Sequence, residues 1–283
     1  MSTPLQAAAV VELHGKDAQA FAQAQFTSDV AALEVGHWQW SAWLDAQGRA
    51  RAFFMLARPD PQRMLAWMPI GDAVVLRDAL SRYVFRAAVG LELAQGWTLY
   101  RLDDGDPPPP RRLLADRGGV RFSLPGRQPR TALLSPGPLD AGEGDDAALQ
   151  AWRLDDALAG LPLLAPELAG EFVPQALELE RLDAIRFDKG CYPGQEIAAR
   201  LHFRGGNKRG LNLLRLGRPP VPAGTAVDEP GGRAVGRVLY SADAPGGEHC
   251  IALAVVEKDF SGKALSIAGG DPAPPLAGKA FLS

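Results

Sequence analysis

A single cysteine in an unusual setting is the part of this sequence most able to do chemistry. The segment DKGCYPGQE, residues 188–196, places Cys191 between Gly190 and Gly194. Both glycines permit backbone angles that other residues disfavour, so we expect the segment to form a tight turn. The following residues, QEIAARL, have high helical propensity. Cys191 is therefore predicted to lie just before a helix, with Pro193 suited to its first turn.

Two nearby features favour the thiolate form of Cys191, which is the nucleophilic and metal-binding form. The N-terminus of a helix stabilises an anion by about 0.3–1 kcal/mol, and Lys189 adds a positive charge. Asp188 partly opposes both effects. We predict that Cys191 is a functional thiol with Lys189 beside it; the alternative is a buried cysteine that only packs.

Basic residues follow on the predicted helix. Arg200 and Arg204 lie four residues apart and so project from one helix face, while two glycines end the helix before Lys208. Such a cluster could hold a carboxylate or a phosphate, although spacing alone favours a solvated basic face. Glu196, one turn before Arg200, either pairs with that arginine or hydrogen-bonds a ligand, and spacing leaves both open.

Other kinds of catalytic site find no support in the sequence. The four histidines are scattered, and no CxxC, HExxH, GxGxxG or GxxxxGK[ST] pattern occurs. Two cysteines are too few for a disulfide framework, and the N-terminus has no targeting pattern. We therefore expect a cytoplasmic protein. The net charge of −3 disfavours a protein that coats nucleic acid, and no apolar run approaches the roughly 20 residues that span a membrane.

The first hundred residues mix helices with antiparallel strands. The pattern predicts helices at 15–30 and 71–85. It predicts a hairpin at 37–58, around the turn AQG, and three further strands at 63–69, 88–93 and 97–102. No βαβ regularity appears, so the fold class is α+β. On the hairpin, Trp38 and Trp40 share one strand face and Trp43 takes the other; core packing is favoured over a stacking platform for them.

A proline-rich linker, DDGDPPPPRR, precedes a second region. This region is predicted to hold strands at 120–124 and 130–134 and helices at 145–158 and 176–187, the last of which leads to the cysteine turn. After residue 206 short strands alternate with Gly/Pro turns, which indicates a small antiparallel barrel or sandwich. We therefore place three domains, at 1–105, 106–205 and 206–283.

Longer stretches carry information beyond spacing. KGCYPGQE followed by IAARLHFRGGNKR resembles the signature of the YgfZ family, folate-binding proteins related to the aminomethyltransferase (T-protein) of the glycine cleavage system. The likeness runs from about residue 12 to 256 and includes LELERLDAIRFDKGCY, FAQAQFTSDV, WLDAQGRARAFF and GRAVGRVLYSA. The chain departs from the family pattern at QAQ near residue 24 and in the proline-rich insertion.

The resemblance implies a ring-like arrangement of ferredoxin-like α+β modules around a central cavity, with a C-terminal antiparallel β-barrel. It implies tetrahydrofolate or a one-carbon derivative as cofactor. It also implies a role in the assembly, repair or maintenance of iron–sulfur cluster enzymes, including those that methylthiolate tRNA. By position it gives a catalytic role to Cys191 and Lys189, no metal site, and cofactor-binding roles to Tyr192, Gln195, Glu196 and Arg200.

Three hypotheses follow. In the favoured one, the protein is an accessory factor that holds folate in the cavity with the Cys191 thiolate near the ring. Its partners would be iron–sulfur carrier or client proteins, without direct contact to nucleic acid or membrane. In the second, the protein is an aminomethyltransferase of the glycine-cleavage type. In the third, it is a non-enzymatic adaptor, and a cluster on Cys191 would need further ligands from a partner. Whether there is catalytic turnover stays open.

Overall fold

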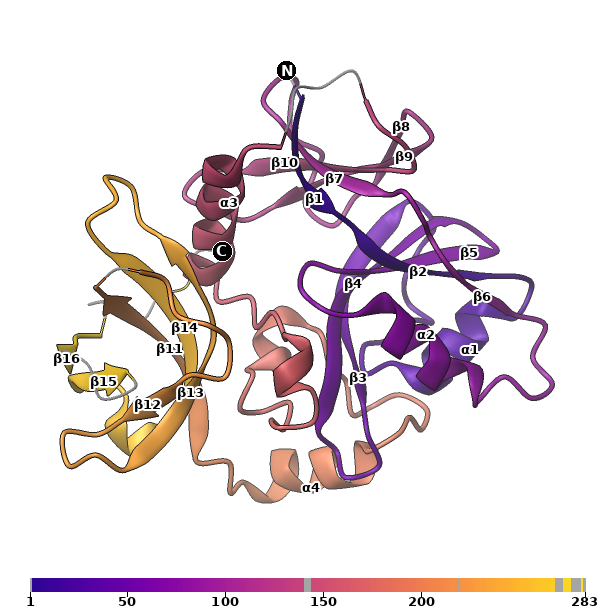
Figure 1. Cartoon of the computed structure of the whole chain (residues 1–283). Helices are drawn as coiled ribbons and strands as arrows, with labels where there is room; N and C mark the ends of the chain where they lie inside the picture. The colour runs from indigo at the N-terminus through magenta and orange to yellow at the C-terminus, as the bar shows by residue number, and fades with distance from the viewer. Residues whose placement is uncertain (1, 140–143, 218, 268–271, 276–280, 282–283) are drawn as a thin grey trace.

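Three antiparallel sheets and four α-helices make up the described part of the chain (Figure 1). The computed structural model describes residues 2–139, 144–217, 219–267, 272–275 and 281. Among these residues, no helix has the length and apolar character needed to cross a membrane. The mixture of helices with antiparallel strands confirms the predicted α+β class.

The N-terminal sheet carries two helices, α1 (Ala18–Gln25) and α2 (Ala73–Ser81), on one face. The helices pack there because their apolar positions, such as Phe21 and Leu80, meet the apolar side chains of the sheet. The predicted helices, hairpin and strands are confirmed, although both helices are shorter than expected. The strands, in spatial order, are β3 (His37–Leu44), β4 (Ala50–Asp60), β5 (Arg63–Met68), β2 (Ala9–His14) and β6 (Gly90–Leu93).

Alternation along β3 divides its tryptophans between the two faces of the sheet, as predicted. Trp38 and Trp40 point away from the helices and pack edge to face, with ring centroids 5.5 Å apart. Trp43 points to the opposite face and joins the core beneath α1 and α2. The β3–β4 turn closes through Gly48, whose φ of 72° is a left-handed conformation that glycine adopts without strain.

The middle sheet draws strands from two sequence regions. The first strand of the chain, which the sequence pattern did not reveal, pairs with β7 (Thr98–Leu102). On its other side β7 pairs with β10 (Arg130–Ser135), across the predicted domain boundary at 105/106, and that boundary stays a prediction. Strands β9 and β10 confirm the two strands expected at 120–124 and 130–134. In spatial order the strands are β1 (Ser2–Ala7), β7 (Thr98–Leu102), β10 (Arg130–Ser135), β9 (Gly119–Leu124) and β8 (Leu114–Asp116).

Helix α3 (Asp146–Leu158) joins the middle sheet to the C-terminal one and confirms the helix expected at 145–158. The Asp145 side chain caps it by accepting a hydrogen bond of 2.9 Å from the Ala147 N–H. Figure 1 shows α3 between the magenta strands of the middle sheet and the orange C-terminal sheet.

The helix predicted for 176–187 is wrong. The segment forms only one 3₁₀ turn, η2 (Leu179–Leu182), bounded by Glu178 and Asp183 in left-handed conformations. Leucines on several sides of this segment are buried, so no single apolar face exists for a helix to present. Thr27 instead holds the extended backbone after the turn, because its hydroxyl donates to the Ala184 carbonyl and its own carbonyl accepts from the Arg186 N–H.

The C-terminal sheet curls around a core of its own that includes Val235 and Cys250. One isolated bridge, between Leu214 and Pro275, links its first strand to the residues after its last one. The short strands predicted after residue 206 are confirmed, whereas a closed barrel stays a prediction. In spatial order the strands are β11 (Arg209–Leu216), β14 (Cys250–Glu257), β13 (Ala234–Asp243), β12 (Ala226–Asp228), β15 (Leu265–Ile267) and β16 (Pro272–Ala273).

Candidate functional site

The cysteine turn lies against the β3–β4 hairpin turn. Gly194, in a left-handed conformation with φ of 74°, is the N-cap of α4 (Gln195–Arg204). The turn and helix predicted around Cys191 are confirmed, except that Pro193 precedes the helix rather than starting it. A Cβ atom on Gly194 would lie 2.7 Å from the Gly48 Cα, so only glycine lets the two turns approach this closely.

Lys189 ties the cysteine turn to the segment that follows α1. Its Nζ donates hydrogen bonds of 2.7 Å to the Phe26 carbonyl and 2.6 Å to the Ser28 carbonyl. Burial lowers the pKa of Lys189 to about 8, while the negative charge of Asp29 acts in the opposite direction. The ammonium therefore faces backbone carbonyls, and it fixes the position of the turn that carries Cys191.

Cys191 is exposed at this turn, whereas Cys250 is buried in the C-terminal sheet. The structure thus rules out the alternative in which Cys191 is a buried packing residue. The neighbouring Tyr192 is buried; its hydroxyl donates to the Arg186 carbonyl at 3.0 Å, and burial raises its pKa. Gln195 donates to the Lys189 carbonyl at 3.4 Å. These contacts hold the turn and leave the sulfur at the surface.

Glu196 and Arg200 are both exposed on α4, and no ion pair between them occurs in the described structure. Of the two readings of Glu196, pairing with Arg200 therefore finds no support. His202, on the same helix, lies 3.0 Å from the Glu180 carboxylate and stacks on Phe187 with ring centroids 4.4 Å apart. Arg200 and Arg204 occupy one exposed helix, as predicted.

A large cavity lies elsewhere, between the N-terminal and middle sheets and the segment after α3. We call it the main cavity; its volume is about 800 Å³. Residues 189–200 are absent from its described lining, so the structure does not bring the predicted site residues into it. The described lining consists of Trp38, Trp40, Pro110, Arg111, Ser123, Leu124, Pro125, Gly126, Arg127, Gln128, Pro129, Ala159, Leu161, Glu178, Arg181, Leu182 and Phe281.

Six of the seventeen described lining residues are aromatic or cationic. Trp38, Trp40 and Phe281 offer flat apolar surfaces, while three arginines and one glutamate supply charge. Arg181 lies over Phe281, with its guanidinium carbon 4.5 Å from the ring centroid. Rings beside guanidinium groups suit a ligand that joins a planar ring system to an anionic group.

Sequence reasoning assigned Trp38 and Trp40 to packing, and they do pack, but the same faces also line the main cavity. Their shared parity on the strand was the available signal. Arg111 was missed because it follows a run of prolines and its place depends on a long-range contact. Its carbonyl accepts a hydrogen bond from the Trp38 N–H at 2.9 Å.

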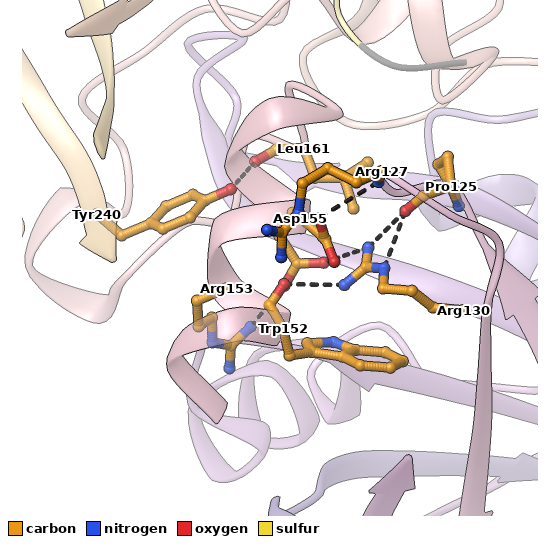
Figure 2. Close-up of polar contacts among 9 residues, drawn as sticks. Pro125, Arg127, Arg130, Trp152, Arg153, Asp155, Leu161 and Tyr240 are labelled. Atoms are coloured by element: carbon orange, nitrogen blue, oxygen red, sulfur yellow. Dashed lines mark hydrogen bonds and ion pairs between the residues drawn. The ribbon is translucent and has the colours of Figure 1, made fainter. Parts of the chain in front are cut away.

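A buried ionic network supports one wall of the main cavity (Figure 2). Asp156 accepts from Arg130 at 2.9 Å and from Arg153 at 3.2 Å. Arg130 also donates to the Pro125 carbonyl, so the loop that lines the cavity is fixed to α3. Arg127, on the same loop, pairs with Asp155 at 2.7 Å.

A second cavity of about 520 Å³ shares Trp38 and Arg111 with the main cavity. Asp188, which precedes the cysteine turn, is part of its lining, together with Asp29, Glu34 and Asp183. Within the described residues, no group of three or more His, Cys, Asp or Glu side chains is arranged to hold a metal ion. The Trp38 and Arg111 side chains therefore lie between the main cavity and a second cavity in which carboxylates outnumber the cationic side chains.

A solved structure shares this architecture. Over 99% of this chain and 86% of that one, it matches the crystal structure of glycine cleavage system aminomethyltransferase T from Bartonella henselae, with a TM-score of 0.76 and 15% identity. At that identity the likeness shows the fold alone.

Curated relatives are closer in sequence. The tRNA-modifying protein YgfZ of Edwardsiella ictaluri (strain 93-146) is 30% identical over 238 residues, which cover 75% of this chain and 70% of that protein. The tRNA-modifying protein YgfZ of Sodalis glossinidius (strain morsitans) is 29% identical over 237 residues, covering 75% and 71% respectively. A scan against protein-family models found no match. The identity and coverage of these relatives confirm the resemblance found in the sequence: the chain belongs to the YgfZ family.

Proposed function

We propose that this protein binds tetrahydrofolate or a one-carbon derivative in the main cavity and supports the assembly, repair or maintenance of iron–sulfur enzymes, including those that methylthiolate tRNA. The observation that carries the folate part is the cavity of about 800 Å³, with aromatic and arginine side chains in its wall. Family membership and the fold shared with an aminomethyltransferase support the same ligand. The setting we propose is the cytoplasm.

The lining fits the chemistry of a folate. Cavities that hold ligands of this size measure roughly 300–1,000 Å³ and are mostly apolar with a few polar groups. Trp40 and Phe281 would contact the flat rings, and the cavity arginines would meet the glutamate carboxylates. A bound tetrahydrofolate would supply one-carbon chemistry; the side chains of this protein would bind it, orient it and exclude water. A ring of modules around the cavity and a closed C-terminal barrel belong to this proposal.

The placement of Cys191 favours contact with a macromolecule over contact with a folate ring inside the main cavity. The sulfur is exposed at the surface, and Cys191 is absent from the described cavity lining. We therefore propose that Cys191 meets an iron–sulfur carrier or client protein, with Lys189 fixing the turn that presents it. This exposure gives specific support to the adaptor hypothesis as a second candidate. Cofactor-binding roles for Tyr192, Gln195, Glu196 and Arg200 stay predictions.

Titration of tetrahydrofolate under anaerobic conditions against the wild type and Cys191→Ser separates the two parts of the proposal. We expect equal affinity, because the sulfur lies outside the main cavity. Complementation of a bacterial strain that lacks its YgfZ-family protein tests the thiol: Cys191→Ser should fold and bind folate but fail to restore iron–sulfur enzyme activity. Full restoration by this variant would remove the role of the thiol, and absence of folate binding by the wild type would remove the folate part.

A further inference from the structure

Three arginines line the main cavity, and two of them already have strong partners. Arg127 pairs with the Asp155 carboxylate at 2.7 Å. Arg181 donates to the Ala159 and Gly160 carbonyls, lies over Phe281, and sits 3.8 Å from the Glu178 carboxylate. Their hydrogen-bonding capacity is therefore largely committed to the protein itself.

Arg111 is different. In the described structure its guanidinium donates one hydrogen bond, of 3.1 Å, to the Leu182 carbonyl, and it has no ion pair with a carboxylate. An arginine side chain has five N–H donors, so most of its capacity is open. The group lies over the Trp38 ring, 5.2 Å from the centroid. Burial lowers its pKa, and the charge of Asp183 only partly counters this effect.

Arg111 has a strained backbone conformation. Its φ of 64° is a left-handed conformation that side chains other than glycine adopt rarely. The surroundings impose this conformation: the Trp38 N–H donates to the Arg111 carbonyl at 2.9 Å, and the Leu113 N–H donates to the Gly36 carbonyl at 2.8 Å. Strain that is held in this way is typical of residues positioned for function.

The charges on either side of Arg111 decide where an anion would bind. The second cavity is lined by four carboxylates, from Asp29, Glu34, Asp183 and Asp188, and by one arginine besides Arg111, namely Arg186, which pairs with Asp183 at 3.3 Å. Glu178 is the one carboxylate in the described lining of the main cavity, and Arg181 lies close to it. Because carboxylates outnumber the cationic side chains of the second cavity, an anionic ligand group is disfavoured there, and it would meet the guanidinium from the main-cavity side.

We propose that Arg111 binds a carboxylate of the ligand in the main cavity and so makes the protein selective for carboxylated pteridines. The proposal rests on the folate function proposed above and deepens it. A guanidinium held over an aromatic ring with open donors suits a bidentate bond to a carboxylate. A pterin ring without the glutamate portion would lack this interaction.

The test compares two probes, 5-formyltetrahydrofolate and the same reduced pterin ring without its aminobenzoylglutamate portion. Isothermal titration of each against the wild type, Arg111→Gln and Arg111→Gly gives the affinities. Glycine suits the left-handed backbone, so Arg111→Gly removes the charge without strain. Arg112→Gln, which alters an exposed neighbour, is the matched control.

We expect both Arg111 variants to bind 5-formyltetrahydrofolate about 10- to 100-fold more weakly, since a hydrogen bond to a charged group is worth that range of affinity. Their affinity for the truncated ring should stay within about twofold of the wild type, and Arg112→Gln should bind both probes normally. Undiminished binding of 5-formyltetrahydrofolate by both variants would overturn this inference alone. An equal loss for both probes would also overturn it. No binding by the wild type would overturn the proposed function as well.

Discussion

Gly194 and Gly48 bring two turns into direct contact, and both adopt left-handed backbone conformations, with φ of 74° and 72°. One turn carries Cys191; the other closes the hairpin whose tryptophans line the main cavity. A Cβ on Gly48 would lie 3.1 Å from the Gly194 carbonyl oxygen, so neither turn has room for a side chain. This contact sets the position of the cysteine relative to the N-terminal sheet.

Gly194→Ala should therefore destabilise the protein. The left-handed conformation costs a residue with a Cβ roughly 1–2 kcal/mol, and crowding in a packed region typically adds about 1–3 kcal/mol. We expect a loss of roughly 2–5 kcal/mol in the free energy of unfolding, measured by urea denaturation. Gly190→Ala is the control, because a Cβ at Gly190 meets no atom within 4 Å. Equal stability of the two variants would contradict the role of this contact.

The buried network around Asp156 predicts a second stability effect. The Asp156 carboxylate is 2% exposed. It pairs with Arg130 and Arg153, whose side chains are 7% and 9% exposed. Asp156→Ala would leave both guanidinium groups buried without a counter-charge, which costs roughly 3–5 kcal/mol. Chemical denaturation of the variant should show this loss.

Asp103→Ala supplies the comparison, because it breaks an exposed pair with Arg101 at 2.8 Å. Exposed pairs contribute about 0–1 kcal/mol. A loss below about 1 kcal/mol for Asp156→Ala, similar to that of Asp103→Ala, would show that the network does not hold the cavity wall in the way we describe.

The two cysteines should differ sharply in reactivity. Cys191 is exposed, whereas Cys250 is fully buried and its sulfur lies 3.2 Å from the Asp243 carboxylate. A thiol reagent such as DTNB should modify one thiol per chain rapidly in the native protein and two after denaturation. Cys191→Ser should abolish the rapid phase. If the native wild type showed no rapid phase, or if Cys191→Ser retained one, Cys191 would not be accessible to solvent.

Local patterns predicted much of the fold. Two β-rich runs joined at a glycine turn identified the hairpin of β3 and β4, although both of its faces are buried, and the residues 145–158 indicated α3. The helix predicted for the segment 176–187 was wrong. Its leucines are buried on several sides, and Glu178 accepts a hydrogen bond from the Leu211 N–H at 3.0 Å, a contact between residues far apart in sequence. Tertiary contacts of this kind override helical propensity.

The candidate site, too, could be predicted from the sequence only in part. The turn before α4 could be predicted, because Gly190 and Gly194 signal it locally. The main cavity could not, since its lining joins the N-terminal hairpin, the residue after the prolines and the segment beyond α3. Arg111 in particular depends on a hydrogen bond to the backbone of Trp38. Residues so far apart in the sequence are brought together only by the packing of the sheets.

Lys189 predicts a pH dependence of stability. Burial lowers its pKa to about 8 in the folded protein, compared with about 10.4 in an unfolded chain. Between these two pH values the unfolded state retains a proton that the folded state has released. The free energy of unfolding contributed by Lys189 therefore rises with pH through this window and is constant below it, where both states are protonated.

We expect the difference in unfolding free energy between the wild type and Lys189→Met to grow in favour of the wild type as the pH is raised from about 8 to about 10. Urea denaturation at several pH values measures this difference, in which the titrations of other groups cancel. Lys208→Met, which removes an exposed lysine, is the control. A difference that falls over the same range would mean that the Lys189 ammonium is stabilised, not destabilised, by its contacts with the Phe26 and Ser28 carbonyls.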